Sequence, residues 1–335
     1  MERIKIPPKL SKDNDKFELT GEYTTVKDET GKEHIVYRIR AKKDIIVNGN
    51  IVVHKGDLGG FIEKEENLDY KSSAWVSGDA KVYGDAKVSG SAWVSGNARI
   101  YENALVYGNA LIYGNAEIHG DAKVYDDAKA YGEAKVYDKA QVYGSAKVYD
   151  KAELYGYAKI YDSAQVYGSA KIYDGAWVFG NAQIYDEAQV YGEAWIYDKA
   201  RIYGKAKAYG NAKVYGNGKI YGSALVYEKA WVSGNAQIYD EAQVYGEAWV
   251  FGEARVHGKA RVSGESRIYE NADVSGDVEV SGNTHITYFI DNEEENWLLR
   301  ELKKNSKKIQ KQIEVRLGIN LKSYRIYEYM SLWKE

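Results

Sequence analysis

The sequence contains no cysteine, which excludes a disulfide framework and any cysteine-based catalysis. Its first sixteen residues, MERIKIPPKLSKDNDK, hold no apolar core of signal-peptide length. No apolar run approaches the about 18 residues that a membrane-spanning helix requires. We therefore expect a soluble, cytoplasmic protein with no membrane partner.

An excess of charge of either sign is also lacking. The 46 basic and 49 acidic residues leave a net charge of −3, and the pI is about 6.1. A chain this close to neutral has no general attraction for nucleic acid, and it is not acidic enough to imitate DNA. We expect no nucleic-acid partner.

One hexapeptide is repeated from Ser73 to Gly282, in 35 consecutive copies without an insertion or a deletion. The second position is Ala in all but three copies, and the fourth is Val, Ile or Leu in all but two. The fifth position is usually Tyr, and the sixth is Gly, Asp or Glu. A six-residue period places no continuous stripe on a helix of 3.6 residues per turn, so the pattern predicts a solenoid of short parallel strands.

The alternation within each copy predicts which side chains are buried. Positions two and four share one face of an extended strand and are never charged, so they should fill the interior. Positions three and five should point outward, and positions six and one carry turn-forming or solvated residues. Examples of the expected buried and exposed sets are Ile160, Val166 and Ile172 against Lys159, Gln165 and Lys171.

The repeat resembles the hexapeptide-repeat superfamily, whose members form left-handed β-helices. In Val82-Tyr83-Gly84-Asp85-Ala86 the spacing between the aliphatic and the small residue agrees with that family, although the slot after the aliphatic residue is usually Tyr or Ser here. The resemblance implies three copies per triangular coil and therefore about twelve coils. We expect an all-β solenoid of this kind over residues 67–288.

Acidic residues recur at the sixth position of every second copy from Asp126 to Asp198. With three copies per coil, each corner would alternate Asp and Gly along the stack, with successive carboxylates about 10 Å apart. Duplication of a two-copy unit would produce the same pattern. A longer duplication is present as well, since NAQIYDEAQVYGEAW begins at Asn181 and again at Asn235.

Residues 1–66 precede the repeat and read as a β-rich cap over the first coil, because an exposed β edge needs a cover. Two β-rich runs, 17–26 and 34–40, flank a turn at 28–32, and a second hairpin is predicted around Asn48-Gly49. The segment Arg38 to Ala41, followed by Gly-Asp-Leu-Gly-Gly-Phe, resembles the leader of uncharacterised bacterial and phage β-helix proteins that are often labelled putative transferases.

Residues 289–335 follow the repeat and predict a partly helical module. Asn292 and Glu295 resemble a capping box, and apolar residues then recur at helical spacing as far as Leu317. We expect a cap on the last coil, with a helical oligomerisation or docking module as the alternative.

Aromatic residues at the third position mark one candidate binding surface. Four tryptophans follow one another at intervals of three, six and three copies, which places them on one face, and Lys213 fills the gap between them. The residues of this candidate face are Trp177, Phe179, Trp195, Tyr197, Trp231, Trp249 and Phe251. Such a face can simply stabilise the sheet, bind a protein or a second copy of the chain, or form a platform for sugars or bases.

The superfamily also implies an enzyme, since many of its members are trimeric acyltransferases that use a His as general base, and some relatives bind zinc through three His. This chain has only His34, His54, His119, His257 and His285, and no partners are evident for them in the sequence. His119 and His257 occupy the fifth position and are expected to be surface variants on different faces. No catalytic residue, metal ligand or cofactor is therefore predicted.

The function that we expect is that of a non-catalytic rigid scaffold that binds a protein. It would be a phage or prophage accessory protein that blocks a host component, and it would self-associate through a solenoid face or the C-terminal module. The alternative is a trimeric hexapeptide-repeat acyltransferase, whose active site would lie between subunits.

Overall fold

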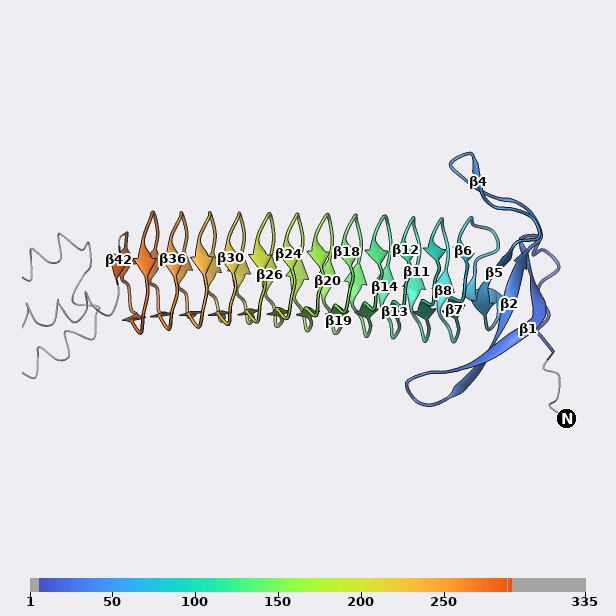
Figure 1. Ribbon diagram of the computed structural model, residues 1–335, viewed down its shortest axis with the longest axis horizontal. Helices are drawn as coiled ribbons and strands as arrows, with labels where there is room; N and C mark the ends of the chain where they lie inside the picture. Colours follow the sequence, from blue (N-terminus) through green and yellow to red (C-terminus); the bar gives the residue numbers. More distant parts are fainter. Residues whose placement is uncertain (1–5, 288, 291–335) are drawn as a thin grey trace, which may run out of the picture. The chain divides into compact units, whose positions relative to one another are not determined.

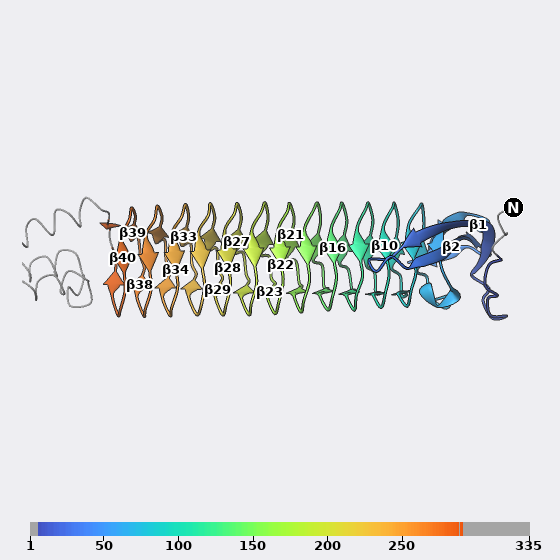
Figure 2. The same cartoon turned by 90° about the horizontal axis from the view of Figure 1, so that it is seen from below.

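A computed structural model describes residues 6–287, 289 and 290, without the side chains of the last two. These residues form a parallel β-solenoid of about 13 turns, drawn in Figures 1 and 2. The chain divides at Ser169 into an N-terminal and a C-terminal compact unit. The helix predicted after Asn292 and its module lie outside the described residues.

The turns of the N-terminal unit stack three sheets. The first sheet contains, in spatial order, β1 (Phe17–Lys27), β2 (Glu33–Ala41), β5 (Leu58–Ile62), β7 (Lys81–Val82), β10 (Arg99–Ile100), β13 (Glu117–Ile118), β16 (Lys135–Val136) and β19 (Glu153–Leu154). The second contains β8 (Lys87–Val88), β11 (Leu105–Val106), β14 (Lys123–Val124), β17 (Gln141–Val142) and β20 (Lys159–Ile160). The third contains β6 (Trp75–Val76), β9 (Trp93–Val94), β12 (Leu111–Ile112), β15 (Lys129–Ala130), β18 (Lys147–Val148) and β21 (Gln165–Val166).

The C-terminal unit has the same construction. Its first sheet contains β22 (Lys171–Ile172), β25 (Gln189–Val190), β28 (Lys207–Ala208), β31 (Leu225–Val226), β34 (Gln243–Val244), β37 (Arg261–Val262) and β40 (Glu279–Val280). Its second contains β23 (Trp177–Val178), β26 (Trp195–Ile196), β29 (Lys213–Val214), β32 (Trp231–Val232), β35 (Trp249–Val250), β38 (Arg267–Ile268) and β41 (His285–Ile286). Its third contains β24 (Gln183–Ile184), β27 (Arg201–Ile202), β30 (Lys219–Ile220), β33 (Gln237–Ile238), β36 (Arg255–Val256), β39 (Asp273–Val274) and β42 (Phe289–Ile290).

Each repeat strand pairs in register with the strand three copies further along, as Gln141–Val142 of β17 pairs with Lys159–Ile160 of β20. The backbone N–H groups at positions one, three and five donate to carbonyls of the next turn; Gln141, for instance, donates to Ala158 over 2.9 Å. This confirms three copies per coil. The count of about 13 turns exceeds the predicted twelve, because β41 and β42 continue the stack beyond Gly282.

The interior is the expected double column of small and branched residues. Ile160, Val166 and Ile172 are fully buried, as predicted. Lys159, Gln165 and Lys171 are half-buried, although we expected them to be exposed. The reason is the close stacking of turns, about 4.8 Å apart, in which neighbouring third-position side chains cover one another.

The corners explain why Asp and Gly share the sixth position. All the acidic residues at this position have positive φ, for example 55° at Asp138, so they adopt the left-handed conformation that Gly adopts at the other corners. The Asp138 carboxylate accepts a hydrogen bond from the backbone N–H of Gly156, one turn on, over 3.1 Å. Pairs of the same kind in the N-terminal unit are Glu102 with Gly120, Asp126 with Gly144 and Asp150 with Gly168. In the C-terminal unit they are Asp174 with Gly192, Asp186 with Gly204, Asp198 with Gly216, Glu228 with Gly246 and Asp240 with Gly258.

Residues 6–66, the leader module, form the predicted β-rich segment. The antiparallel pair β1–β2 continues through β5, which pairs in parallel with β7 of the first turn. The module therefore extends the first sheet rather than lying loosely over it, and Figures 1 and 2 show the β1–β2 hairpin beside the first turns. The predicted second hairpin is present as β3 (Ile45–Val47) and β4 (Asn50–Val53), and it projects away from the turns (Figure 1).

Two buried polar side chains donate hydrogen bonds to backbone carbonyls where the second and third sheets begin, at β8 and β6. Asn67, at the end of the 3₁₀ helix η1 (Glu65–Asn67), is fully buried and donates to the carbonyls of Gly84 and Ala86 over 3.1 and 2.9 Å. The Lys16 amine is buried and donates to the carbonyls of Asp69 and Ala74 over 2.8 and 2.5 Å. Burial lowers the pKa of Lys16 to about 7. A specific polar contact thus replaces the missing neighbouring turn.

Candidate docking surface

The four predicted tryptophans lie in one sheet of the C-terminal unit. They occupy the third position in four strands of the second sheet, and the same column also contains Lys213, Arg267 and, after Arg267, His285. We call the part of this column that ends at Arg267 the tryptophan ladder; its members are Trp177, Trp195, Lys213, Trp231, Trp249 and Arg267. The structure therefore brings together the residues that the three-copy spacing selected.

Parallel strands hold the ladder in face-to-face contact. The rings of Trp177 and Trp195 stack with centroids 5.3 Å apart, and those of Trp231 and Trp249 stack at 4.7 Å, each pair within 4° of parallel. The Lys213 ammonium lies between the two pairs, 5.3 Å from the Trp195 ring and 4.8 Å from the Trp231 ring. The Arg267 guanidinium covers Trp249 at 5.3 Å. These are favourable cation–π distances, so the column stabilises its own sheet.

This stacking decides what the ladder can offer to a ligand. Both faces of Trp195 are covered, by Trp177 and Lys213, and both faces of Trp249 are covered, by Trp231 and Arg267. A sugar ring or a base needs a free aromatic face to stack on. Trp195 and Trp249 are nevertheless 37% exposed, and this exposure lies at the ring edges. The ladder presents a ridged, largely apolar surface with embedded cations, which fits a protein better than a sugar or a base.

A second column runs beside the ladder at the fifth position of the same copies. Its members are Phe179, Tyr197, Tyr215, Ser233, Phe251 and Tyr269. Phe179 stacks on Tyr197, and Tyr197 on Tyr215, each with centroids 5.0 Å apart. Ser233 is the one small member, and the Tyr215 ring meets Trp231 edge-on at 6.5 Å beside it. Together the two columns form an aromatic strip across six turns.

Similar tyrosine columns follow the fifth position throughout both units, and the sequence analysis did not predict them. In the N-terminal unit Tyr107, Tyr125 and Tyr143 stack with centroids 4.8 and 4.9 Å apart. Partial burial, together with its tyrosine neighbours, raises the pKa of Tyr125 to about 12. The signal was available in the sequence, because tyrosines in every third copy must stack on one corner once three copies make a turn.

The histidines are less isolated than the sequence indicated. The buried His34 ring lies 2.9 Å from a Glu63 carboxylate oxygen at Nδ1 and 3.2 Å from Asp28 at Nε2. Hydrogen bonds from Thr30, with a contribution from His34, lower the pKa of Asp28 to about 2. Glu63 also accepts the backbone N–H of Gly84 over 2.6 Å. The expectation that the histidines have no partners was wrong, because carboxylates from distant segments reach them: Asp28 lies in the β1–β2 turn and Glu63 follows β5.

His119 corrects a second expectation. We predicted a surface variant at the fifth position, but the side chain is only 6% exposed. It stacks between Tyr101 and Tyr137 at 4.6 and 5.0 Å, and it lies 3.5 Å from Glu29 of the β1–β2 turn. The fifth position sits at a corner, where rings of adjacent turns cover each other.

His257, by contrast, is half-buried, and its Nε2 lies 2.7 Å from Asp273. Its Nδ1 lies 3.9 Å from Asp240, and its ring stacks on Tyr239 with centroids 4.6 Å apart. Both ring nitrogens of His257 therefore have an acidic neighbour.

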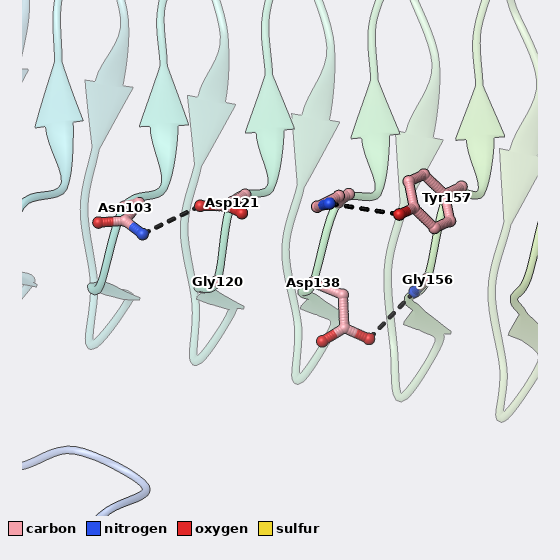
Figure 3. Close-up of a pocket in the computed structure, with 7 residues that line it drawn as sticks. Asn103, Gly120, Asp121, Asp138, Gly156 and Tyr157 are labelled. Carbon is pink, nitrogen blue, oxygen red and sulfur yellow. Dashed lines mark hydrogen bonds between the residues drawn. The ribbon is translucent and has the colours of Figure 1, made fainter.

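A polar groove of about 380 Å³ follows one corner of the N-terminal unit (Figure 3). Asn103 donates to Asp121 over 3.0 Å, and the Lys139 amine donates to the hydroxyl of Tyr157 over 3.2 Å. These groups pair with one another along the stack and do not converge on a common point. Among the described residues, no three His, Cys, Asp or Glu side chains are grouped as a metal ion would need.

Comparison with known proteins agrees with the architecture. A family model described as the YdcK beta solenoid repeat matches residues 98–114. No curated protein matches the chain. Within the described residues, no helix has the length and apolar character needed to cross a membrane. The protein is therefore a β-helix repeat protein that resembles the YdcK type over one short segment.

Proposed function

We propose that the protein is a non-catalytic, rigid binding scaffold whose docking surface is the tryptophan ladder. The single observation that carries this proposal is the exposure of Trp195 and Trp249 within a column whose ring faces are already covered. Large apolar edges that remain accessible on a regular sheet are typical of protein interfaces.

The histidine environments also support a binding role. A hexapeptide-type acyltransferase needs a His that reaches its substrate as a general base. His34 and His119 are buried and lie against carboxylates. Binding of acetyl-CoA, measured by calorimetry, would favour the acyltransferase over the scaffold.

The biological setting of the proposal rests on the leader module. Its Gly-Asp-Leu-Gly-Gly-Phe segment and the hexapeptide repeat resemble bacterial and phage proteins. We therefore infer a phage or prophage accessory protein that binds a host component. This inference is an analogy drawn from fold and leader.

The proposal predicts that changing Trp195 and Trp231 together to Lys abolishes partner capture. The fold should remain intact, because both side chains point away from the interior and Lys213 already occupies the equivalent position. Each anchor should contribute about 2 kcal/mol or more to binding. The measurement is capture from host lysate, followed by mass spectrometry, for the wild type and the double variant.

The matched control is Gln189→Lys with Leu225→Lys. These residues lie in the first sheet, the same number of turns apart as Trp195 and Trp231. The control should retain the partner. Unchanged capture with a lowered melting temperature in the tryptophan variant would show that the ladder only stabilises its sheet.

A further inference from the structure

The order of residues along the aromatic strip of the C-terminal unit decides whether the strip can pair with a second copy of itself that runs in the opposite direction. Along six turns the ladder runs Trp177, Trp195, Lys213, Trp231, Trp249, Arg267. Two members are cations, and they are three turns apart. A surface that binds a second copy of itself through a two-fold axis must be complementary to its own reverse, since residue i then meets residue j and j meets i.

We propose that the occupant of the aromatic strip is a second copy of this chain, docked antiparallel, with the two-fold axis between Lys213 and Trp231. This inference rests on the proposed function, because it names a second copy of the chain, in place of a host component, as the partner of the same surface. In this register Lys213 faces Trp231 of the second copy, Trp195 faces Trp249, and Trp177 faces Arg267. No cation therefore faces another cation, and the remaining tryptophans meet each other at their exposed edges.

The second column is complementary in the same register. Tyr197 faces Phe251 of the second copy, and Phe179 faces Tyr269, so aromatic rings meet aromatic rings. Tyr215, a large residue, faces Ser233, the one small residue in the column. A match of large with small at the centre allows two flat sheets to approach closely.

Charge disfavours two alternative registers. If the two copies were parallel at equal height, Lys213 would face Lys213 and Arg267 would face Arg267. An antiparallel pair with its axis at Lys213 would also oppose that cation to itself. Juxtaposed like charges are strongly unfavourable at an interface, so both alternatives are disfavoured.

The corners beside the strip add one favourable and one unfavourable pair. On the corner that follows the second sheet, Lys199 faces Glu253 of the second copy, and both are exposed. On the other corner Glu193 faces Glu247, whose carboxylate already pairs with Lys229 over 2.8 Å. Both pairs lie at the solvated rim, where they contribute little.

The size of the strip sets the strength of association that we expect. Six turns at about 4.8 Å and a strand segment of about 18 Å give roughly 500 Å² per copy. The total of about 1,000 Å² is near the lower limit of specific interfaces. We therefore expect a weak but specific dimer.

Because the chain has no cysteine, single cysteines can report the register without background. The variants Lys199→Cys and Glu253→Cys are mixed and treated with a bismaleimide that spans about 8 Å. The mixture should give a covalent dimer, and each variant alone should not, because like positions are three turns, or about 14 Å, apart along the axis. The matched control is Lys205→Cys mixed with Lys259→Cys, at the same separation on the corner opposite the second sheet.

Sedimentation between 1 and 100 µM measures the same association without a crosslinker. Changing Trp249 to Lys should raise the dimer dissociation constant at least about 30-fold, because Trp249 meets Trp195 on both sides of the axis. A wild-type monomer at 100 µM, self-crosslinking of Lys199→Cys, or equal crosslinking of the control pair would overturn the pairing. If the wild type is a monomer and the Trp195→Lys/Trp231→Lys variant still loses capture from lysate, the pairing is wrong and the proposed function stands. Retained capture and retained dimer in that variant would overturn the proposed function as well.

Discussion

The leader module and the repeat both provide hydrogen-bond partners for backbone groups at strand ends and turns, but they do so in different ways. In the repeat, each turn is served by the next turn, and the corners reuse one acid–glycine contact many times. In the leader module and directly after it, Lys16 and Asn67 each occupy a unique buried site and serve carbonyls that have no neighbouring turn.

The two regions therefore differ in how far the structure depends on a single residue. A repeat residue has many equivalents, but its surroundings are crowded on both sides by adjacent turns. A leader residue has no equivalent, but parts of its surroundings are open. Substitutions of the same type should therefore have different costs in the two regions.

The largest contrast should come from Gly→Ala changes at positive φ. At Gly108, φ is 69° and an added Cβ would lie 2.6 Å from the backbone N of Asp126 in the next turn. At Gly56, φ is 95° and nothing lies within 4 Å of an added Cβ. We expect Gly108→Ala to cost about 3 kcal/mol or more and Gly56→Ala about 1–2 kcal/mol. Urea unfolding would check both, and equal costs would show that the turns can separate to admit a methyl group.

A smaller contrast should come from Asn→Ala changes. Asn67→Ala leaves the carbonyls of Gly84 and Ala86 without this donor, and the N–H group of Lys64 loses its acceptor, whereas that of Glu63 keeps the carbonyl of Val82. We expect a loss of about 2–3 kcal/mol, seen as faster hydrogen exchange in β5 and β7. The control, Asn97→Ala, removes an exposed contact with Asn115 and should cost about 0.5 kcal/mol or less. Equal protection in both variants would contradict the cap role of Asn67.

A third contrast concerns pH. The pKa of Lys16 falls from 10.5 in the unfolded chain to about 7 in the folded protein. The unfolded chain therefore binds more protons between pH 7 and 10.5, and stability should rise with pH in this window by up to about 1.4 kcal/mol per unit. Lys16→Met should remove this slope when unfolding is compared at pH 7 and pH 9. A slope that persists in the variant would assign it to other groups.

Much of the solenoid could be predicted from the sequence because its determinants are local. The six-residue period fixes the alternation, the turn and the interior columns, as Ile160 and Val166 confirm. The three-copy spacing likewise grouped the tryptophans correctly in one sheet. These features need only the period and the number of copies per turn.

The parts that could not be predicted depend on contacts between distant segments. The ring neighbours of His119 follow from the three-copy spacing, but its contact with Glu29 of the β1–β2 turn does not. The faces of the tryptophans are covered because Lys213 and Arg267 point between or over rings of other turns. A linear pattern gives the height of a side chain along the stack but not the direction of its last rotatable bonds.

The acid–glycine contact at the corners has a consequence for how such a chain can lengthen. Where Asp and Gly alternate between successive copies, as from Asp126 to Asp162, adding two copies keeps every carboxylate above a glycine. Adding one copy would place two carboxylates in adjacent turns, about 5 Å apart, where they repel by about 1 kcal/mol. In this stretch the shortest insertion that preserves every acid–glycine contact is two copies. The chain should therefore lengthen in steps of twelve residues, although the structural repeat has six.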